Sequence, residues 1–458
     1  MWAKDGGIYL GYSAGRIEGE PPALSHPPYR YTGDRHLITI GPNGSGKSHR
    51  VLRPNLVLLK SWSVVVVDPK GELFQKVGEL RDPGLKNTLI LNPFKVLLDR
   101  SDGFNPVSAL DPASEDFPDD ALALAEALIR MEGKDPHWAA SAQDLVAALI
   151  MYSRLSNRKG GSLAHVREML GRPMKALKET IQKLMVIATN RNCPELATKG
   201  GRFVDLSEDS RELLSIISTA LTQTRWLDSR PMKADLNQTH AFDFMTLKET
   251  PTSIYLILPA HRLGTHSTWM LLMIAAILQP LLKETTPAKV PVLVMLDEYP
   301  ALAEGGFPVI EKNMAIFRGY GIKLWTVFQD LSQAKRLYGE HWESFAANAG
   351  VLQSFAPQDL VTADYLSQRT GLRSVKLQSA GTSTTINPGQ PESRSDSTNL
   401  AVQPVALLLP QELRNMDMGF SIYFSHEAKG PRRVYFPWMV PGIDDVTVEN
   451  QAENQVAS

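Results

Sequence analysis

The sequence predicts an α/β protein with a mostly parallel central sheet, a phosphate-binding loop and an inserted all-α domain. Short β-branched runs alternate with helical patterns, and such nearly continuous apolar runs are typical of strands buried on both faces of a parallel sheet. A glycine-rich loop directly follows the first run that we assign to the sheet, which indicates a phosphate site. A long block of consecutive helical patterns interrupts the alternation and indicates the inserted domain.

Composition narrows the class of protein before any motif is considered. The chain has 458 residues and 43% hydrophobic content, for which two or three globular domains are expected. The formal net charge is −1, so any contact with nucleic acid must come from a local cluster of Lys and Arg. The single cysteine, Cys193, excludes an internal disulfide and fits a reducing cytosol. The start of the chain lacks the pattern of a signal peptide, and the histidines lack the spacing of a structural metal site.

Six apolar runs are predicted to be strands of the central sheet. They span residues 36–40, 63–67, 88–91, 253–258, 292–296 and 323–328. Helical patterns lie between several of them, so the strands are expected to be joined by right-handed crossovers. The apolar run from Trp269 to Leu282 is too short to span a bilayer and contains Gln279 and Pro280, so we interpret it as a core helix.

A P-loop follows the run at 36–40. The pattern G-x-x-x-x-G-K-[ST] is formed by Gly41, Pro42, Asn43, Gly44, Ser45, Gly46, Lys47 and Ser48. The glycines let the backbone point its N–H groups at a phosphate, and the following helix adds its positive N-terminal end. Lys47 would reach the β- and γ-phosphates of ATP, and Ser48 would hold Mg²⁺. The alternative is a surface glycine turn.

The helical block predicts the domain boundaries. We expect residues 1–116 and 241–442 to form the nucleotide-binding domain, 117–240 an inserted all-α domain, and 443–458 a disordered tail. The expected helices are 118–130, 137–155, 163–170, 174–188 and 207–226, with Ser207 as a plausible N-cap of the last. The strands from the segments before and after the insertion must then pair in one sheet. Residues 378–399, rich in Ser, Thr, Gly and Pro, are expected to form a flexible loop.

Two carboxylates end the run at 292–296. Four apolar strand residues followed by Asp297 and Glu298 match the second signature of P-loop ATPases. Asp297 would help to coordinate Mg²⁺, and Glu298 would polarise the attacking water as general base. The alternative is a solvated strand end, but the P-loop upstream favours the catalytic interpretation.

Three further residues are candidates for the same site. Gln329 ends the next predicted strand and could sense the γ-phosphate, or its amide could close a turn. Arg318 ends a predicted helix and could act as an arginine finger on a neighbouring subunit, or be an ordinary surface arginine. Asp68 follows the second predicted strand at the sheet edge where ligands of α/β folds bind, and could touch the water shell of Mg²⁺ or end a turn.

Together these stretches resemble the type IV secretion coupling proteins, the TraG/TraD group of conjugative DNA-transfer ATPases. The matching stretches are 41–48, 53–56, 64–73, 91–93, 104–106, 137–138, 296–302, 318–322 with Gln329, 337–339 and 359–367. The resemblance implies a RecA-like motor domain carrying an all-α domain that contacts relaxosome or effector proteins. It also implies a hexameric ring that hydrolyses ATP with Mg²⁺ and drives a DNA–relaxase substrate, as single-stranded DNA through the ring pore, toward a secretion channel.

The family pattern also leaves alternatives open. Family members usually begin with two transmembrane helices, which the sequence does not show. Three explanations are open: an anchor was removed, a separate membrane protein supplies it, or the chain belongs to a soluble branch. We expect a cytoplasmic protein bound peripherally at the bacterial inner membrane. The cargo could instead be protein effectors, or the chain could be a cytosolic DNA pump of the FtsK/HerA type. Lys429, Arg432 and Arg433 form a basic cluster that could contact DNA, although a solvated turn before a strand at Val434 is favoured.

Overall fold

The central layer of the molecule is one large sheet. The computed structural model describes residues 4–14, 27–131, 136–156, 160–238, 242–284, 286, 288–302, 307–385, 393–428 and 430–437. Within these residues the sheet has the order β2-β1-β13-β12-β9-β3-β8-β7-β4-β6-β5. The strands are β1 Ile8–Ser13, β2 Tyr29–Tyr31, β3 His36–Ile40, β4 Ser63–Asp68, β5 Thr88–Leu91, β6 Ser253–Ile257, β7 Val292–Leu296, β8 Ile322–Phe328, β9 Ala349–Phe355, β12 Phe420–Ser425 and β13 Arg432–Tyr435.

The pairing confirms the predicted α/β class with a mostly parallel sheet. Strand β3 pairs in parallel with β8 and β9, β8 with β7, and β4 with both β7 and β6. Strands from before and after the helical block therefore lie side by side, as predicted. The part of the sheet beyond β9 is antiparallel and contains β12, β13, β1 and β2, of which the sequence indicated only the strand at Val434.

Helices cover both faces of the sheet, and successive side chains along each strand pack against the helices on opposite faces. Val65 and Val67 of β4 pack into the core that includes α10 (Leu263–Lys283) and α12 (Pro308–Phe317). Val64 and Val66 pack into a second core with α1 (Arg53–Leu58) and α2 (Glu72–Arg81). The remaining helices of this part are α11 Tyr299–Leu302, α13 Leu331–Tyr338, α14 Trp342–Ala347, α15 Leu360–Thr370 and α16 Pro410–Arg414. This two-sided burial explains the continuous apolar runs in the sequence.

Helix α10 contains the apolar run from Trp269 to Leu282. By length and composition the segment Ala260–Lys283 could cross a membrane, but 61% of its most apolar window is buried inside the molecule. Trp269, Leu272 and Leu278 are fully buried in the core that α10 shares with the sheet. Helix α10 is therefore a core helix of this fold, which agrees with the interpretation made from the sequence.

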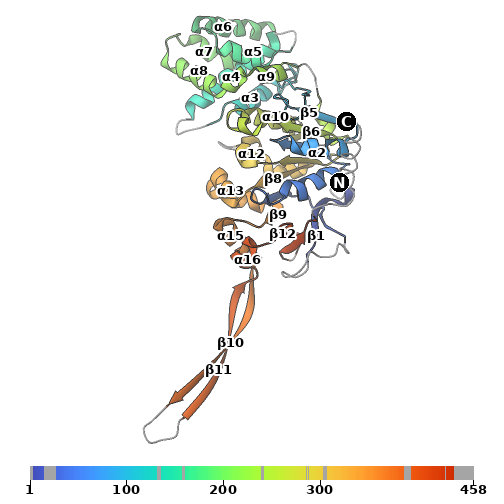
Figure 1. Cartoon of the computed structure of the whole chain (residues 1–458). Coiled ribbons are helices and arrows are strands. Elements are labelled where there is room, and N and C mark those ends of the chain that lie inside the picture. Colours follow the sequence, from blue (N-terminus) through green and yellow to red (C-terminus); the bar gives the residue numbers. More distant parts are fainter. Residues whose placement is uncertain are drawn as a thin grey trace.

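In the described part of the segment between β5 and β6, seven α-helices form a block at one end of the molecule (Figure 1). They are α3 Phe117–Leu128, α4 His137–Ser156, α5 Leu163–Leu170, α6 Met174–Asn190, α7 Pro194–Asp205, α8 Arg211–Gln223 and α9 Arg230–Leu236. The predicted N-cap at Ser207 is wrong: α8 begins later, and the hydroxyl of Ser210 accepts a hydrogen bond from the Leu213 N–H. Helices α7 and α9 were not predicted.

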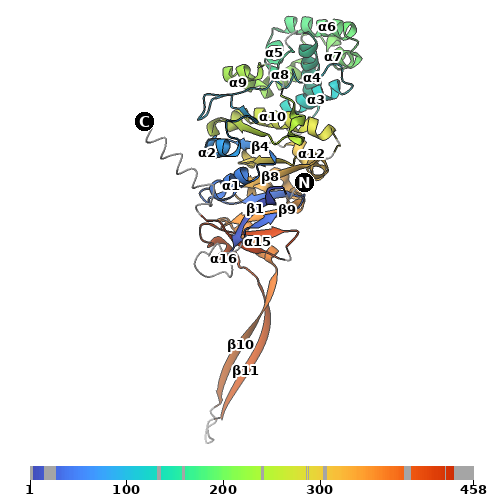
Figure 2. The same cartoon turned by 90° about the vertical axis from the view of Figure 1, so that its right-hand side faces the viewer.

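A long hairpin projects from the opposite end of the molecule (Figures 1 and 2). Strands β10 (Leu372–Thr385) and β11 (Ser393–Ala406) pair antiparallel over fourteen residues each. The prediction of a flexible loop at 378–399 is therefore wrong for residues 378–385 and 393–399, because each strand completes the backbone hydrogen bonds of the other. The predicted disordered tail at 443–458 lies outside the described residues.

Candidate nucleotide-binding site

The P-loop begins at the carboxyl end of β3. Gly44 (φ 78°) and Gly46 (φ 87°) adopt left-handed backbone conformations that L-residues with side chains rarely adopt. The Gly41 N–H donates to the Phe328 carbonyl of the neighbouring strand β8, at 3.0 Å. A short π-helical stretch from Ser48 to Leu52 follows and continues into α1, so the loop sits at the N-terminal end of a helical stretch. This is the geometry of an anion-binding site.

The loop forms one wall of a cavity of about 400 Å³. Beside the P-loop, the lining contains residues from the carboxyl ends of β4 and β7. The full lining is Asn43, Gly44, Ser45, Gly46, Lys47, Ser48, His49, Arg53, Asp68, Pro69, Lys70, Glu72, Leu73, Asp297, Glu298 and Met418. Predicted site residues from three distant stretches of the sequence therefore share one cavity. The sequence placed the polar residues of the stretch 68–72, Lys70 and Glu72 among them, at the ligand-binding edge of the sheet but assigned a role to Asp68 alone. It assigned no role to Arg53 or Met418.

Strand order brings Gln329 to the two carboxylates. Strand β8 lies between β3 and β7, so the residue after β8 lies between the P-loop and Glu298. The Gln329 side-chain amide donates to Glu298 Oε2 at 3.2 Å. The backbone N–H of Gln329 donates to Gln333 Oε1 at 2.9 Å, which fixes the end of the strand. Glu298 is thus oriented by a group that itself is held in place.

Glu298 has an unusual backbone conformation. Its φ is 54°, in the left-handed region that non-glycine residues rarely adopt, at a cost on the order of 1–2 kcal/mol. Its N–H donates to Asp297 Oδ1 at 3.1 Å. Such strain is found most often at active sites, where the surrounding fold enforces it. The sequence contained no signal for this feature, because the residue type at a left-handed position is usually Gly or Asn.

Charges in the cavity perturb one another. Burial, with the neighbouring Glu298 carboxylate, raises the pKa of Asp297 to about 7, although Lys47 opposes the shift. Burial also raises the pKa of Asp68 to about 6 and lowers the pKa of Lys47. The Lys47 ammonium donates to the carbonyls of Gly41, at 2.5 Å, and Pro42, at 3.2 Å. A bound cation would stabilise the ionised carboxylates of Asp297 and Asp68, and a bound phosphate would stabilise the charged Lys47 ammonium.

The donor set fits a magnesium–nucleotide complex. The Ser45 hydroxyl is buried and has no hydrogen-bond partner among the described residues, so a ligand oxygen could satisfy it. Lys47 and the loop N–H groups suit phosphate oxygens, and the hydroxyl of Ser48 and the carboxylate of Asp297 suit Mg²⁺, a hard cation that prefers oxygen ligands.

Asp68 lies in the same cavity but also has a structural partner. Its Oδ2 accepts a hydrogen bond from the Phe74 N–H at 2.8 Å, at the start of α2. The position of Asp68 is therefore compatible with both interpretations made from the sequence. It stabilises the turn after β4, and it lines the cavity.

Arg318 lies far from this cavity. It precedes β8, whereas Gln329 follows it, and seven strand residues separate the two edges of the sheet by roughly 20 Å. The Arg318 side chain is 54% exposed and lies 3.8 Å from Asp34 in an ion pair. It cannot reach the P-loop of its own chain. If Arg318 is an arginine finger, it must therefore act at the nucleotide site of a neighbouring chain.

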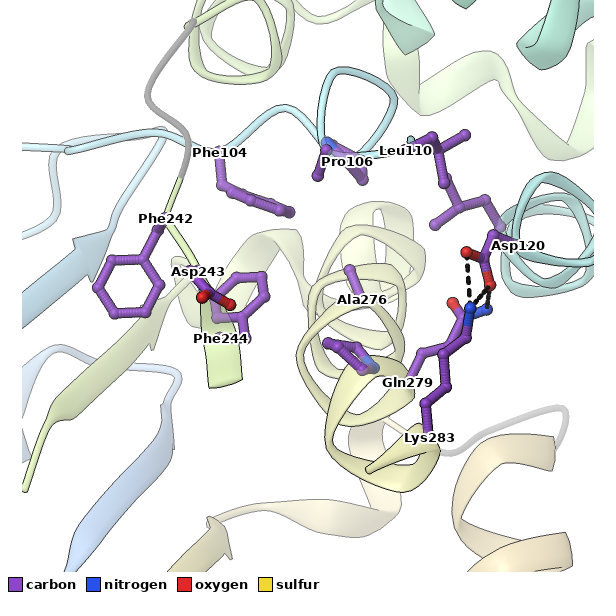
Figure 3. A pocket seen from close by; sticks show the side chains of 13 residues that line it. Phe104, Pro106, Leu110, Asp120, Phe242, Asp243, Phe244, Ala276, Gln279 and Lys283 are labelled. Atoms are coloured by element: carbon purple, nitrogen blue, oxygen red, sulfur yellow. Dashed lines mark hydrogen bonds and ion pairs between the residues drawn. The ribbon is translucent and has the colours of Figure 1, made fainter. Parts of the chain in front are cut away.

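A second cavity, of about 350 Å³, lies where the helical block joins the sheet layer (Figure 3). Phe104, Phe242 and Phe244 line it from the two connecting segments, and α10 supplies Ala276 and Lys283. Lys283 donates to Asp116 and Asp120, each at 2.8 Å, and so ties α10 to α3. Its mainly apolar lining does not resemble a phosphate site.

Fold and site together define a P-loop NTPase with a RecA-like core, in which strand β8 separates the phosphate-binding strand from the acidic one. The family model for type IV secretory system conjugative DNA transfer matches residues 14–441, and the chain belongs to this family. This agrees with the resemblance found in the sequence.

Individual relatives are similar to the chain over most of its length. The conjugal transfer protein TraG of Escherichia coli is 26% identical over 77% of this chain and 58% of its own length. TraG of Rhizobium radiobacter is 26% identical over 86% of this chain and 60% of its own length. The chain thus spans about three fifths of these relatives.

Solved structures show the same fold. The bacterial conjugative coupling protein TrwB, in a trigonal form with sulphate, has a TM-score of 0.66 and 15% identity, covering 89% of this chain and 86% of that one. TrwB in complex with ADP and Mg²⁺ has a TM-score of 0.64 and 15% identity, with the same coverage of both chains.

Proposed function

We propose that this chain is the ATP-hydrolysing coupling protein of a conjugation system, which recruits a DNA–relaxase substrate and drives it toward a secretion channel. The observation that carries the proposal is the cavity in which Lys47 and Ser48 face Asp297 and Glu298. Membership in the conjugative DNA transfer family supports the cargo, and a similar fold in a protein solved with ADP and Mg²⁺ supports the cofactors.

Each residue has a distinct task in hydrolysis. Lys47 and the N–H groups of the P-loop hold the phosphates, while Ser48 and Asp297 hold the magnesium ion. Glu298 accepts the proton of the attacking water, and Gln329 keeps its carboxylate oriented toward the cavity. Bound Mg²⁺–ATP supplies the reactive phosphoanhydride and the charge that lets Asp297 ionise. Asp68 remains a candidate for the outer shell of the metal.

Assembly and partners extend the proposal. We expect a homo-hexamer in which Arg318 of one subunit reaches the site of the next, since its position excludes action within its own chain. Single-stranded DNA would pass through the ring pore. The helical block at the far end of the molecule would bind the relaxosome (Figure 1). We expect the ring to act at the cytoplasmic face of the bacterial inner membrane, with a channel or anchor protein as its membrane partner.

The test is the ATPase rate measured with and without single- and double-stranded DNA, as a function of protein concentration. We expect DNA to stimulate turnover and the specific activity to rise with protein concentration, because the finger comes from another subunit. The Glu298→Gln protein, prepared identically, is the control for contaminating ATPases. A rate independent of both DNA and protein concentration would contradict a DNA-driven ring motor.

A further inference from the structure

The strand order gives the P-loop two different sides. Asp297 and Glu298 follow β7 and Gln329 follows β8, and both strands lie on one side of β3. Strands β9 and β12 lie on the other side (Figure 1). Because β12 runs antiparallel to β9 and β9 parallel to β3, the start of β12 lies at the same sheet edge as the P-loop. Met418, two residues before β12, therefore reaches the nucleotide cavity from the side opposite these hydrolytic residues.

Three residues of the cavity lining have no task in the hydrolysis described above. His49 and Arg53 come from the helical stretch after the P-loop, and Met418 comes from the turn before β12. The Met418 side chain is 65% exposed and also lines a neighbouring hollow of about 270 Å³. It gives a mainly polar cavity an apolar wall that the chain itself leaves largely uncovered. A phosphate gains nothing from such a wall, whereas the organic part of a nucleotide does.

Arg53 presents a planar group to the same cavity. Its Nη1 donates to His49 Nδ1 at 3.2 Å, which links two residues four positions apart on the helical stretch. A guanidinium that is held by a hydrogen bond in its own plane keeps its flat faces available, and such faces stack on aromatic rings. The thioether of a methionine also makes favourable contacts with aromatic rings. The lining thus contains two groups that bind a flat aromatic ligand by its faces.

The turn that carries Met418 is held against the P-loop. The Phe436 N–H donates to the Gly419 carbonyl at 2.8 Å, and Gly419 has a left-handed φ of 95°. The buried Arg50 side chain lies between this turn and the loop. A Cβ at Gly419 would lie 2.6 Å from Arg50 Nη1, and a Cβ at Gly46 would lie 2.9 Å from Arg50 Cδ. The fold therefore fixes the position of the turn relative to the phosphate-binding loop.

We propose that Met418 and Arg53 form a clamp that holds the base of the bound nucleotide by its two faces. This inference rests on the nucleotide site of the proposed function and names the part of the ligand that lies on the β12 side of the P-loop. Because the γ-phosphate must lie near Glu298, the base lies at the other end of the nucleotide, on that side. The clamp contacts the faces of the base and not its hydrogen-bonding edge, so it accepts adenine and guanine alike.

Calorimetric titration with two ligands tests the clamp. Mg²⁺–ATP carries a base, whereas magnesium tripolyphosphate occupies the phosphate site alone. Met418→Ala should weaken ATP binding about threefold to tenfold and change tripolyphosphate binding less than about twofold, because the thioether contacts only the base. Met131→Ala removes another exposed methionine, outside the cavity lining, and is the matched control. It should bind both ligands as the wild type does.

Arg53→Lys separates stacking from charge. Lysine keeps the positive charge but has no planar face, so ATP binding should again weaken about threefold to tenfold while tripolyphosphate binding changes less than about twofold. GTP should bind the wild type within about threefold of ATP. Unchanged ATP affinity in either variant, an equal loss for ATP and tripolyphosphate, or a tenfold preference between ATP and GTP would overturn the clamp.

The tripolyphosphate titration separates this inference from the proposed function. Wild-type protein that binds neither ligand contradicts the nucleotide site of the proposed function, and the clamp with it. Wild-type protein that binds both ligands, with variants that lose neither or lose both equally, contradicts the clamp alone. The phosphate site made by the P-loop then stands without it.

Discussion

Asp297 is the residue whose ionisation most directly links the site to pH. Its pKa in the folded chain is about 7, above its ordinary value, because burial and Glu298 oppose the negative charge. The protonated Asp297 carboxyl group therefore makes its full contribution to the free energy of unfolding below about pH 4. This contribution is lost as the pH rises through about 7. A bound magnesium ion reverses this preference, since it requires the carboxylate.

Two opposite pH effects follow for the same side chain. Without ligand, Asp297→Asn should raise the free energy of unfolding at pH 8 by on the order of a few kcal/mol, and by much less at pH 4. With wild-type protein, Mg²⁺–ATP affinity should fall as pH decreases below 7, because a proton competes with the metal. Urea unfolding and calorimetry at pH 5 and 8 measure both effects. A pH-independent affinity, or equal stabilisation at both pH values, would contradict this assignment of Asp297.

Glu298 is assigned as the general base by its position next to Gln329 and its strained backbone. Glu298→Gln should bind Mg²⁺–ATP with near wild-type affinity and hydrolyse it about 10²–10⁴-fold more slowly, because the amide cannot accept the proton. Turnover and affinity are measured separately. Glu72→Gln, which alters another carboxylate in the same cavity, is the control and should retain most activity. Near wild-type turnover by Glu298→Gln would move the base elsewhere.

At the scale of elements, Arg81 joins three segments of the second core. Its guanidinium donates to the carbonyls of Leu56 at 2.5 Å, Leu59 at 2.9 Å and Trp62 at 2.5 Å, where α1 ends and β4 follows. It also donates to the Ser253 hydroxyl at 2.9 Å, on β6. The side chain thus satisfies carbonyls at the C-terminal end of α1 that the helix leaves without partners.

Removing this guanidinium should be costly. Arg81→Ala removes the guanidinium donor from the Leu56 and Trp62 carbonyls and the Ser253 hydroxyl, at about 1–3 kcal/mol for each group left buried without a partner. The Leu59 carbonyl still accepts from the Trp62 N–H at 3.1 Å. We expect a loss of about 3 kcal/mol or more in the free energy of unfolding, measured with urea. Arg100→Ala, which breaks the half-exposed ion pair with Asp102, is the control and should cost less than about 1 kcal/mol. Equal losses in both variants would contradict the anchoring role of Arg81.

The elements that could be predicted from the sequence are those whose pattern is local. Strands 36–40, 88–91 and 292–296 were predicted with the observed bounds because both faces are buried and the runs are continuous. Helix α7 was missed because it contains two glycines. A Cβ at Gly200 would lie 2.4 Å from Leu184 Cδ2 of α6, so the glycine leaves room for that side chain between the two helices. Helix propensity alone cannot reveal such a contact.

The hairpin and the antiparallel half of the sheet depend on partners distant in sequence. Residues 378–399 have the composition of a loop, and only pairing of β10 with β11 makes residues 378–385 and 393–399 strands. For the site, the P-loop and the pair Asp297–Glu298 could be predicted from spacing, and the structure brings them to one cavity. The left-handed conformation of Glu298 had no signal in the sequence, whereas the distance of Arg318 from that cavity follows from its position before β8 and that of Gln329 after it.

At the scale of the whole molecule, Arg318 lies on the opposite edge of the sheet from the P-loop. If it completes a neighbour's site, mixing Arg318→Ala with Lys47→Ala subunits should partly restore ATPase activity, because some interfaces then combine an intact P-loop with an intact arginine. Activity is measured over a range of mixing ratios. Arg211→Ala, an exposed arginine on α8, is the control and should be active alone. Mixtures that never exceed the sum of their components would contradict the finger.

The central claim is that the P-loop and the Asp297–Glu298 strand end bind one magnesium–ATP complex between them. Calorimetric titration of Mg²⁺–ATP into wild-type and Lys47→Ala protein tests it most directly, with Lys60→Ala as a control on an exposed lysine outside the cavity. The account predicts one site per chain in the wild type and in Lys60→Ala, and at least a hundredfold weaker binding in Lys47→Ala, about 2.7 kcal/mol. Equal affinity in the wild type and Lys47→Ala, or no binding by the wild type, would contradict it.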